Sequence, residues 1–369
     1  MKKQAVFVAA TGQHVGKTTI CLGLMSGLKK RYKSVGFIKP IGQEHVETDT
    51  GIHVDKDVIL FKDHFGLKTT PAMMSPILFP RGFTRDYLDG KINEKELGNK
   101  IKTAYQLVAR ESDTIVVEGT GHVGVGSIVN FNNARVATEL NLHLILIASG
   151  GLGSSFDALA LNKALCDAYK VKIIGVILNR VHEDKKDMVL HYMGKALKTW
   201  GIPILGCVPF DPFLSNPSMQ DYEALFKASL LSGESHHMRH FFHMRLVANP
   251  LKNYQELILP NQLIITSANR EDIILATLEK HWEVKNANPN NDLAFGMILT
   301  DMPPPRQTII EALKKADIPM LYAPVSSYKV MEMLTSYTVK IRKEDTEKIN
   351  EAITLVESHI NFDTLLNLN

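Results

Sequence analysis

The stretch AVFVAATGQHVGKTT, residues 5–19, joins a short apolar run to a Gly-Lys-Thr triplet. Apolar residues then recur at Ile20, Leu24 and Leu28, the spacing of one helix face. A strand, a glycine-containing loop and a helix in this order are the context that a phosphate-binding loop (P-loop) needs. The usual pattern has another glycine where Thr11 stands, and the neighbouring Gly12 can supply the same backbone freedom.

This loop is therefore predicted to bind the phosphates of a nucleotide. Amide N–H groups of such a loop and of the following helix form a concave anion site. Gly16 would let the backbone approach the phosphates, Lys17 would neutralise the β and γ oxygens, and Thr18 would hold Mg²⁺. The predicted nucleotide-binding residues of the loop are Gly12, Gln13, His14, Val15, Gly16, Lys17, Thr18 and Thr19.

The composition is that of a globular protein. The 369 residues are 45% hydrophobic and 22% charged, which is enough chain for two or three domains. A net charge of +3 is too weak to predict nucleic-acid binding. The apolar runs are too short for a membrane span or a signal sequence, and the three cysteines have no metal-binding spacing. We expect a cytoplasmic protein without nucleic-acid or membrane partners.

Short runs rich in Val, Ile and Leu alternate with helical patterns through the first part of the chain. Such alternation predicts a parallel sheet with right-handed crossovers, and the continuous apolar runs predict strands buried on both faces. The overall class is α/β. The predicted strands are residues 5–10, 35–40, 113–119, 142–150, 172–180 and 202–210.

A second alternation begins after a proline-rich segment at 209–221. We place a domain boundary near residue 215, which gives domains of 1–215 and 216–369. A last helix at about 345–360 is expected to close the second domain. The second domain is predicted to contain strands at 262–268, 294–300 and 318–325 and helices at 270–282, 306–316 and 326–336.

Four charged residues are candidates to complete the site. Lys39 follows a predicted strand, at the edge where α/β sheets bind ligands. Glu118 ends the run IVV and, if buried, needs a metal or another partner. Asp55 and Asp57 could each reach a metal or merely cap a helix. The predicted catalytic residues are Lys17, Lys39 and Glu118, and the predicted Mg²⁺ ligands are Thr18, Glu118 and either Asp57 or Asp55.

Several motifs together resemble the dethiobiotin synthetase family, and still more the synthetase-like N-terminal part of long phosphotransacetylases. The resemblance covers residues 1 to about 215 and implies a P-loop NTPase domain of dethiobiotin synthetase type that binds ATP and Mg²⁺. It also implies that Asn179 and Pro209 hold the adenine and that Lys39 meets a small-molecule substrate. The motifs are ATGQHVGKTT (10–19), FIKPIGQ (37–43), VVEGTGHVG (116–124), IASGGLGS (147–154), GVILNRV (175–181) and GCVPFDP (206–212).

The departures from this family lie on the substrate side. Gln13 and His14 replace Thr and Glu, Gln43 replaces a serine, and Gly151 replaces a lysine. We therefore expect phosphoryl transfer from Mg-ATP to a carboxylate or carbamate of another small molecule. The alternative is an ATP-sensing regulatory protein without productive turnover, which the altered residues favour. The resemblance also implies a homodimer, with residues 149–155 near the neighbour's site.

The second half resembles the DRTGG domain that follows this unit in long phosphotransacetylases. The resemblance implies a smaller α/β domain with a regulatory or oligomer-forming role. Ala268, Asn269, Asp301 and Met302 replace residues of the family's turns. No phosphotransacetylase catalytic domain lies within the 369 residues, so acetyl transfer is not expected of them. The motifs are LIITSANREDIILATL (263–278), GMILTDMPPP (296–305) and ADIPMLYAP (316–324).

Overall fold

Six parallel strands form the central sheet of the first part of the chain, in the order β10-β9-β8-β1-β7-β2. The computed structural model describes residues 4–289 and 291–367. All six strands predicted for this part are present, and most of the described strand side chains are buried. The strands are β1 (Gln4–Ala10), β2 (Val35–Ile38), β7 (Thr114–His122), β8 (Leu144–Ser149), β9 (Ile173–Val181) and β10 (Ile204–Pro209).

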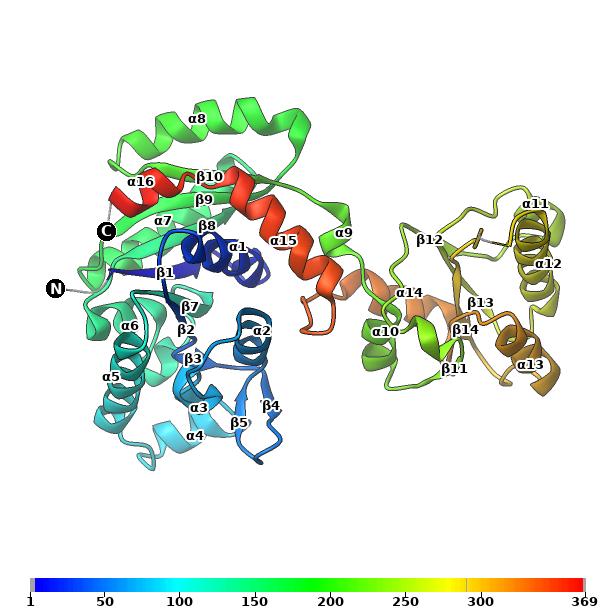
Figure 1. Ribbon diagram of the computed structural model, residues 1–369, viewed down its shortest axis with the longest axis horizontal. Helices are drawn as coiled ribbons and strands as arrows, with labels where there is room; N and C mark the ends of the chain where they lie inside the picture. The colour runs from blue at the N-terminus through cyan, green and yellow to red at the C-terminus, as the bar shows by residue number, and fades with distance from the viewer. Residues whose placement is uncertain (1–3, 290, 368–369) are drawn as a thin grey trace. The chain divides into compact units, whose positions relative to one another are not determined.

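Helices that connect these strands pack against the sheet (Figure 1). Two small strand pairs, β3 with β6 and β4 with β5, lie between β2 and β7 in sequence. Their bounds are β3 (Ile41–Gly42), β4 (His45–Glu47), β5 (His53–Asp55) and β6 (Ile77–Leu78). The helices are α1 (Lys17–Lys29), α2 (Lys56–Phe65), α3 (Pro71–Met74), α4 (Phe83–Leu88), α5 (Glu94–Arg110), α6 (Asn133–Leu140), α7 (Gly153–Ala168) and α8 (Lys186–Lys198).

A second sheet, in the order β11-β15-β14-β13-β12, forms a separate unit. Strands β12 to β15 run parallel and β11 runs antiparallel to β15, so the predicted α/β class is confirmed here also. The strands are β11 (Leu230–Ser232), β12 (His243–Leu246), β13 (Gln262–Ser267), β14 (Gly296–Thr300) and β15 (Met320–Ala323). The helices are α9 (Pro212–Ser215), α10 (Met219–Phe226), α11 (Leu251–Gln255), α12 (Glu271–Ala287), α13 (Gln307–Lys315) and α14 (Ser327–Ser336).

The end of the chain differs from the expected division at residue 215. Helices α15 (Thr346–His359) and α16 (Phe362–Asn367) belong to the first unit, where α15 packs on α1 and β10. The first unit is Met1–Asp211 with Ile341–Asn369, and the second is Pro212–Lys340. The expectation that the last helix closes the second domain is therefore wrong.

Two glycines on α1 give the physical reason for this arrangement. A Cβ atom on Gly23 would lie 2.3 Å from Cβ of Val356, and one on Gly27 would lie 2.1 Å from Cζ of Phe362. Because these positions lack side chains, α15 and α16 can approach the backbone of α1 closely. The two glycines, four residues apart, were the available sequence signal for this packing.

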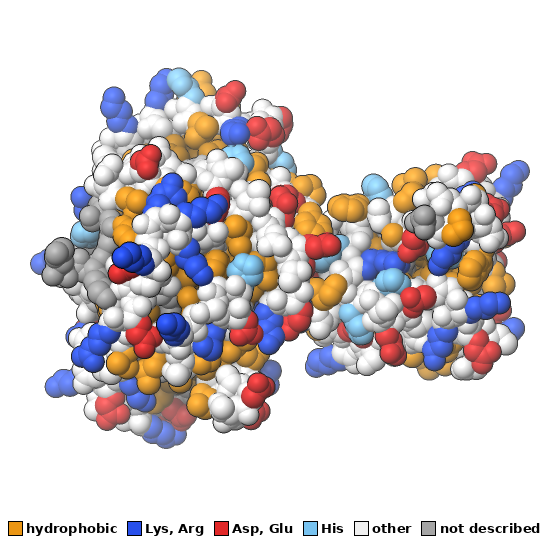
Figure 2. Space-filling view, viewed as in Figure 1, with side chains coloured by type: hydrophobic (Ala, Val, Ile, Leu, Met, Phe, Trp, Pro, Cys, Tyr) orange, Lys and Arg blue, Asp and Glu red, His pale blue; other side chains and the backbone are white. Residues whose placement is uncertain are grey.

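Charged side chains of both signs are interspersed on the visible face of each unit (Figure 2). Within the described residues, no helix combines the length and the apolar character needed to cross a membrane.

Candidate functional site

The Gly-Lys-Thr loop leaves the carboxyl end of β1, which lies between β7 and β8 in the sheet. Gly16 is the N-cap residue of α1 and has a φ of 96°, a conformation that suits glycine. A Cβ atom here would also lie 2.3 Å from Nδ2 of Asn179. No side chain caps the N-terminus of α1, so its first amide groups are available to an anion.

Two buried asparagines hold the loop in place. Asn179, on β9, donates from Nδ2 to the carbonyl of Val15 at 2.7 Å. Asn162, on α7, donates to the carbonyl of Thr11 at 3.0 Å and accepts from the amide of Val123 at 3.0 Å. Thr11 also donates its amide to Ile147 at 2.9 Å. The backbone of Thr11 is therefore tied to its neighbours, which fits a residue other than glycine there.

Asn179 and Pro209 are the two residues predicted to hold the adenine. The side chain of Asn179 is 3% exposed and braces the loop, a role that the sequence did not reveal. Pro209 ends β10, beside β9, at the carboxyl edge of the sheet. The adenine contacts of both residues stay predictions.

Glu118 and Thr18 meet directly beside the loop. Oγ1 of Thr18 donates to Oε1 of Glu118 at 3.1 Å. Glu118 is 1% exposed, and its Oε2 has no hydrogen-bond partner within the described residues. A buried carboxylate oxygen without a partner is costly, and carboxylate and hydroxyl oxygens are ligands that Mg²⁺ accepts. The pair therefore fits the predicted metal role.

The pKa values of Glu118 and Lys17 are both shifted toward the neutral forms of these side chains. Burial, aided by the negative charge of Asp57, raises the pKa of Glu118 to about 7, although Lys39 and Lys17 oppose the rise. Burial also lowers the pKa of Lys17, an effect that Glu118 opposes. The protein thus leaves a buried carboxylate that a bound cation would stabilise in its charged form.

Lys39 reaches the same region from the neighbouring strand. Ile38 of β2 pairs with Val117 of β7, so Lys39 and Glu118 follow at the same level of adjacent strands. The ammonium group of Lys39 bonds to Oδ1 of Asp55 at 2.9 Å and to Oδ2 of Asp57. Burial alone would lower the pKa of Lys39, but Asp57, Glu118 and Asp55 together raise it well above its usual value.

Asp55 fills the capping role that its sequence position allowed, and its metal role stays a prediction. It is the N-cap residue of α2, and its Oδ1 accepts the amide of Asp57 at 3.0 Å. Its own amide donates to Oγ of Ser75 at 3.0 Å, a contact that the sequence did not indicate. Of the two aspartates, Asp57 has the larger effect on Glu118. No group of three His, Cys, Asp or Glu side chains in the described residues is arranged as a metal cluster.

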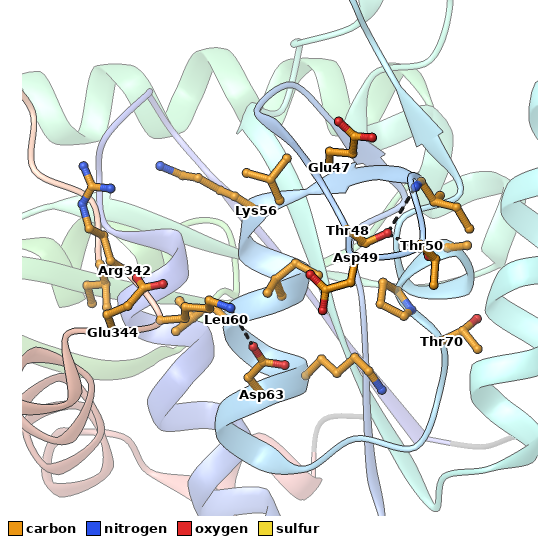
Figure 3. A pocket seen from close by; sticks show the side chains of 18 residues that line it. Glu47, Thr48, Asp49, Thr50, Lys56, Leu60, Asp63, Thr70, Arg342 and Glu344 are labelled. Carbon is orange, nitrogen blue, oxygen red and sulfur yellow. Dashed lines mark hydrogen bonds and ion pairs between the residues drawn. The ribbon is translucent and has the colours of Figure 1, made fainter. Parts of the chain in front are cut away.

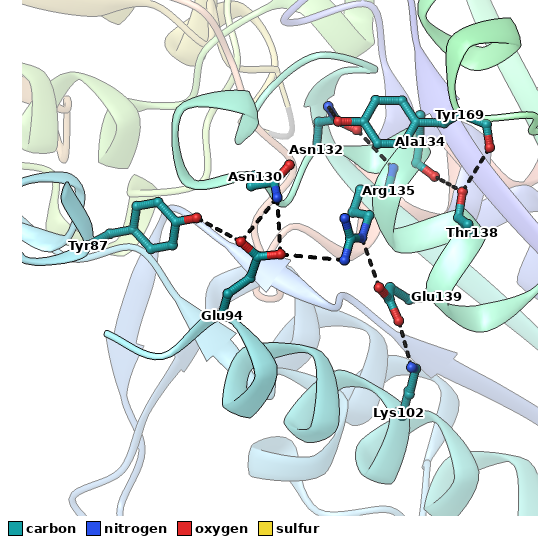
Figure 4. A network of polar contacts seen from close by, with 10 residues as sticks. All are labelled: Tyr87, Glu94, Lys102, Asn130, Asn132, Ala134, Arg135, Thr138, Glu139 and Tyr169. Atoms are coloured by element: carbon teal, nitrogen blue, oxygen red, sulfur yellow. Dashed lines mark hydrogen bonds and ion pairs between the residues drawn. The ribbon is translucent and has the colours of Figure 1, made fainter. Parts of the chain in front are cut away.

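The segment that follows Glu118 is held by a surface network of polar contacts (Figure 4). Glu94 accepts from Tyr87 at 3.0 Å and from Asn130 at 3.0 Å, and these bonds keep the pKa of Glu94 below its usual value. Arg135 bonds to Glu139 at 2.8 Å and also reaches Glu94 at 3.4 Å. The network ties α5 and α6 to the turn that carries Asn130.

Removing the Glu118 charge is expected to stabilise the nucleotide-free protein at high pH. The folded pKa lies above the unfolded value, so stability is fully present below the unfolded pKa and is lost as the pH rises through about 7. Glu118→Gln stays neutral and should be more stable than wild type at pH 8.5 by on the order of 2 kcal/mol, but not at pH 5. Urea unfolding checks this, with Glu96→Gln as an exposed control. An equal difference at both pH values would contradict it.

Two protein families match consecutive parts of the chain. Residues 4–218 match an AAA domain family, AAA_26, and residues 223–337 match the DRTGG domain. Phosphate acetyltransferase of Pseudomonas putida is 28% identical over 371 residues, which cover 97% of this chain and 50% of that protein. The Pseudomonas aeruginosa phosphate acetyltransferase is 27% identical over 380 residues, covering 97% and 51%. The chain thus spans about half the length of these curated relatives.

Two solved structures show a partial likeness in fold. Cobyrinic acid a,c-diamide synthase from Mycobacterium smegmatis, with bound ATP analog and magnesium, is 15% identical and has a TM-score of 0.37 over 56% of this chain and 84% of its own. A ParA family ATPase from Chlorobium tepidum is 17% identical, with a TM-score of 0.35 over 57% and 85%. The predicted resemblance to part of the long phosphotransacetylases is confirmed by the sequence matches. The chain belongs to the AAA domain family AAA_26, and a DRTGG domain follows its P-loop domain.

Proposed function

We propose that the first domain binds Mg-ATP and transfers the terminal phosphoryl group to a carboxylate or carbamate oxygen of a small molecule beside Lys39. The observation that carries this proposal is the buried oxygen of Glu118, which has no partner and lies beside Thr18 at the start of α1. Thr18 and Glu118 would hold Mg²⁺. Of the two aspartates, Asp57 raises the pKa of Glu118 more strongly, so it is the preferred third candidate. Bound Mg²⁺ supplies charge neutralisation at the phosphate oxygens.

The side chains of this chain would act mainly by positioning and by neutralising charge. The amides at the start of α1 would bind the phosphates, and Lys17 would neutralise their terminal oxygens. Lys39, now paired with Asp55 and Asp57, would exchange one carboxylate for the substrate. An acceptor carboxylate is already ionised at neutral pH, so its attack needs no general base from the protein.

A specific observation favours a second candidate function. Gln13, His14 and Gln43 are exposed and differ from the residues expected of a dethiobiotin-forming site. The curated relatives are about twice as long and are phosphate acetyltransferases. Under this alternative the domain binds ATP without turnover and reports its occupancy through the DRTGG domain to an enzyme of acetyl or acetate metabolism.

Trapping of an acyl phosphate tests the proposal and separates it from the alternative. The protein is incubated with Mg-ATP, a panel of small carboxylic acids and hydroxylamine, and both ADP and hydroxamate are measured. Transfer predicts acceptor-dependent formation of both, and Glu118→Gln should be at least about tenfold slower. Glu96→Gln, an exposed acid on α5, is the matched control.

Two other results would contradict phosphoryl transfer. ATP binding without ADP formation for any acceptor, a bicarbonate and amine mixture included, would favour the sensor. Failure of the folded protein to bind Mg-ATP would reject both candidates.

A further inference from the structure

Strand β7 bulges directly after Glu118. Val8 of β1 pairs with Glu118. The next pair joins Ala10 to His122, so one residue of β1 stands opposite three residues of β7, 119–121. Such a bulge leaves backbone groups without partners in the sheet. The first two bulged residues are buried, so their backbone groups need partners from elsewhere in the chain.

Asn133, the first residue of α6, supplies these partners from its side chain. Its Oδ1 accepts the amide of Thr120 at 3.0 Å, and its Nδ2 donates to the carbonyls of Thr120 and His122, both at 2.8 Å. Its own amide donates to the carbonyl of Val123 at 3.0 Å. Asn133 is 5% exposed, and its side-chain amide uses its acceptor oxygen and its donor nitrogen together. The bulge is therefore held by α6 and not by the sheet.

Gly119 makes this close approach possible. A Cβ atom at this position would lie 2.6 Å from Oδ1 of Asn133 and 3.1 Å from the carbonyl oxygen of Val8. A side chain here would displace either the asparagine or β1. The residue next to Glu118 thus has the one side-chain size that lets Asn133 reach the bulge.

Thr120 connects the same bulge to the segment that follows Lys39. Its hydroxyl donates to the carbonyl of Ile41 in β3, and Thr120 is 7% exposed. From β3 the chain continues into the β4–β5 hairpin, which lines a cavity of about 800 Å³ beside α2 (Figure 3). Because the hairpin is open on that side, the buried bond to Ile41 is important for fixing the start of this segment.

We propose that Asn133 and Thr120 are positioning residues of the Mg-ATP site, which fix the bulge after Glu118 so that its carboxylate stays beside Thr18 and can bind Mg²⁺. This inference rests on the proposed function. Oε1 of Glu118 accepts from Thr18, and Oε2 has no hydrogen-bond partner within the described residues. The carboxylate is thus oriented mainly through the backbone of β7, and residues that orient a ligand in this way affect metal affinity.

A positioning role differs from a purely structural one in what it changes. Loss of a buried hydrogen bond lowers stability wherever the bond lies. Loss of a positioning residue also changes how well Glu118 meets a cation, and this second effect disappears once the Glu118 carboxylate is absent.

ATP binding with and without the metal tests the proposal. Calorimetry of the full chain gives the Kd in Mg²⁺ and in EDTA, and their ratio is the gain from the metal. Asn133→Ala should reduce this gain roughly tenfold and leave binding in EDTA within about twofold of wild type. Val136→Ala, which removes buried apolar volume from the same helix, is the control; it should lose stability but keep the full gain.

A double-mutant cycle tests whether Asn133 acts through Glu118. Asn133→Ala should weaken Mg-ATP binding in the wild-type background but not in the Glu118→Gln background. An equal loss in both backgrounds would show that Asn133 only supports the fold, and it would overturn the proposal.

A second pair of variants guards against a folding defect. Thr120→Val removes the hydroxyl and should reduce the gain, whereas Thr120→Ser keeps the hydroxyl and should bind as wild type does. If circular dichroism shows that Asn133→Ala does not fold, this pair decides. Hydrogen exchange of residues 116–124 should be faster in Thr120→Val than in Thr120→Ser.

The outcomes separate this inference from the proposed function. An unchanged gain in both Asn133→Ala and Thr120→Val would reject the positioning role alone, provided that wild type binds Mg-ATP. Failure of wild type to bind Mg-ATP would reject the proposed function and the positioning role with it.

Discussion

Lys39→Met is expected to lower the free energy of unfolding by about 3 to 5 kcal/mol at neutral pH. Lys39 is 8% exposed, and its ammonium group is held between the carboxylates of Asp55 and Asp57. Methionine keeps most of the apolar stem, so the main loss is the cation. Two buried carboxylates would then face each other without a counter-charge. Urea unfolding at pH 7 measures the difference.

Two comparison variants show whether the loss of stability in Lys39→Met comes from the missing charge or from altered packing. Lys39→Met/Asp55→Asn/Asp57→Asn removes the carboxylates as well and should recover most of the loss. Lys343→Met breaks only an exposed pair with Asp63 and should cost less than about 1 kcal/mol. In Lys39→Met the folded pKa of both carboxyls rises, so stability is retained below the unfolded pKa and is lost as pH rises. An undiminished deficit at pH 4 would contradict this explanation.

The sequence predicted the part of the site that depends on strand order. Each buried strand appeared as an apolar run, and a polar residue directly after such a run must lie at the carboxyl edge of a parallel sheet. That reasoning placed Lys17, Lys39 and Glu118 in one region, and the register of β1, β7 and β2 brings their strand ends together.

The side-chain partners could not be predicted in the same way. Asp55 and Asp57 were candidates for a metal or for a cap, because spacing alone does not show that the Lys39 ammonium lies between them. Asn162 lies in a helix and its sequence position gives no sign that it joins the loop to Val123, the residue after β7. These contacts depend on how the helices pack on the sheet, which local pattern does not specify.

The last helices illustrate a different limit. Linear order suggested that α15 completes the second domain, but α15 and α16 pack on the first. Amphipathic patterning shows that a helix has an apolar face without showing which surface that face will cover. The deciding feature was on the partner helix, where Gly23 and Gly27 leave room for Val356 and Phe362.

Lys17→Ala is expected to weaken Mg-ATP binding by roughly 100-fold, or about 3 kcal/mol. Lys17 begins α1, where it would meet the terminal phosphates, and a charged hydrogen bond in a partly buried site is worth more than one in water. Burial lowers the pKa of Lys17, although the charge of Glu118 opposes the effect, so we expect its cation to be only partly compensated without nucleotide. A phosphate would supply that compensation, so the cation interacts more favourably with ligand bound than without it.

Thermal unfolding with and without nucleotide measures this loss. At a free Mg-ATP concentration near 100 times the wild-type Kd, the ligand should stabilise wild type by about 2.7 kcal/mol, and Lys17→Ala by less than about 0.5 kcal/mol. Lys33→Ala removes an exposed lysine beyond the end of α1 and should behave as wild type does. Equal stabilisation of Lys17→Ala and wild type would show that the loop does not bind the phosphates through this lysine. The Gly16 conformation and the Asn179 contact do not involve the Lys17 side chain, so the variant should keep its fold. The measured difference would then report the contribution of the Lys17 charge to Mg-ATP binding.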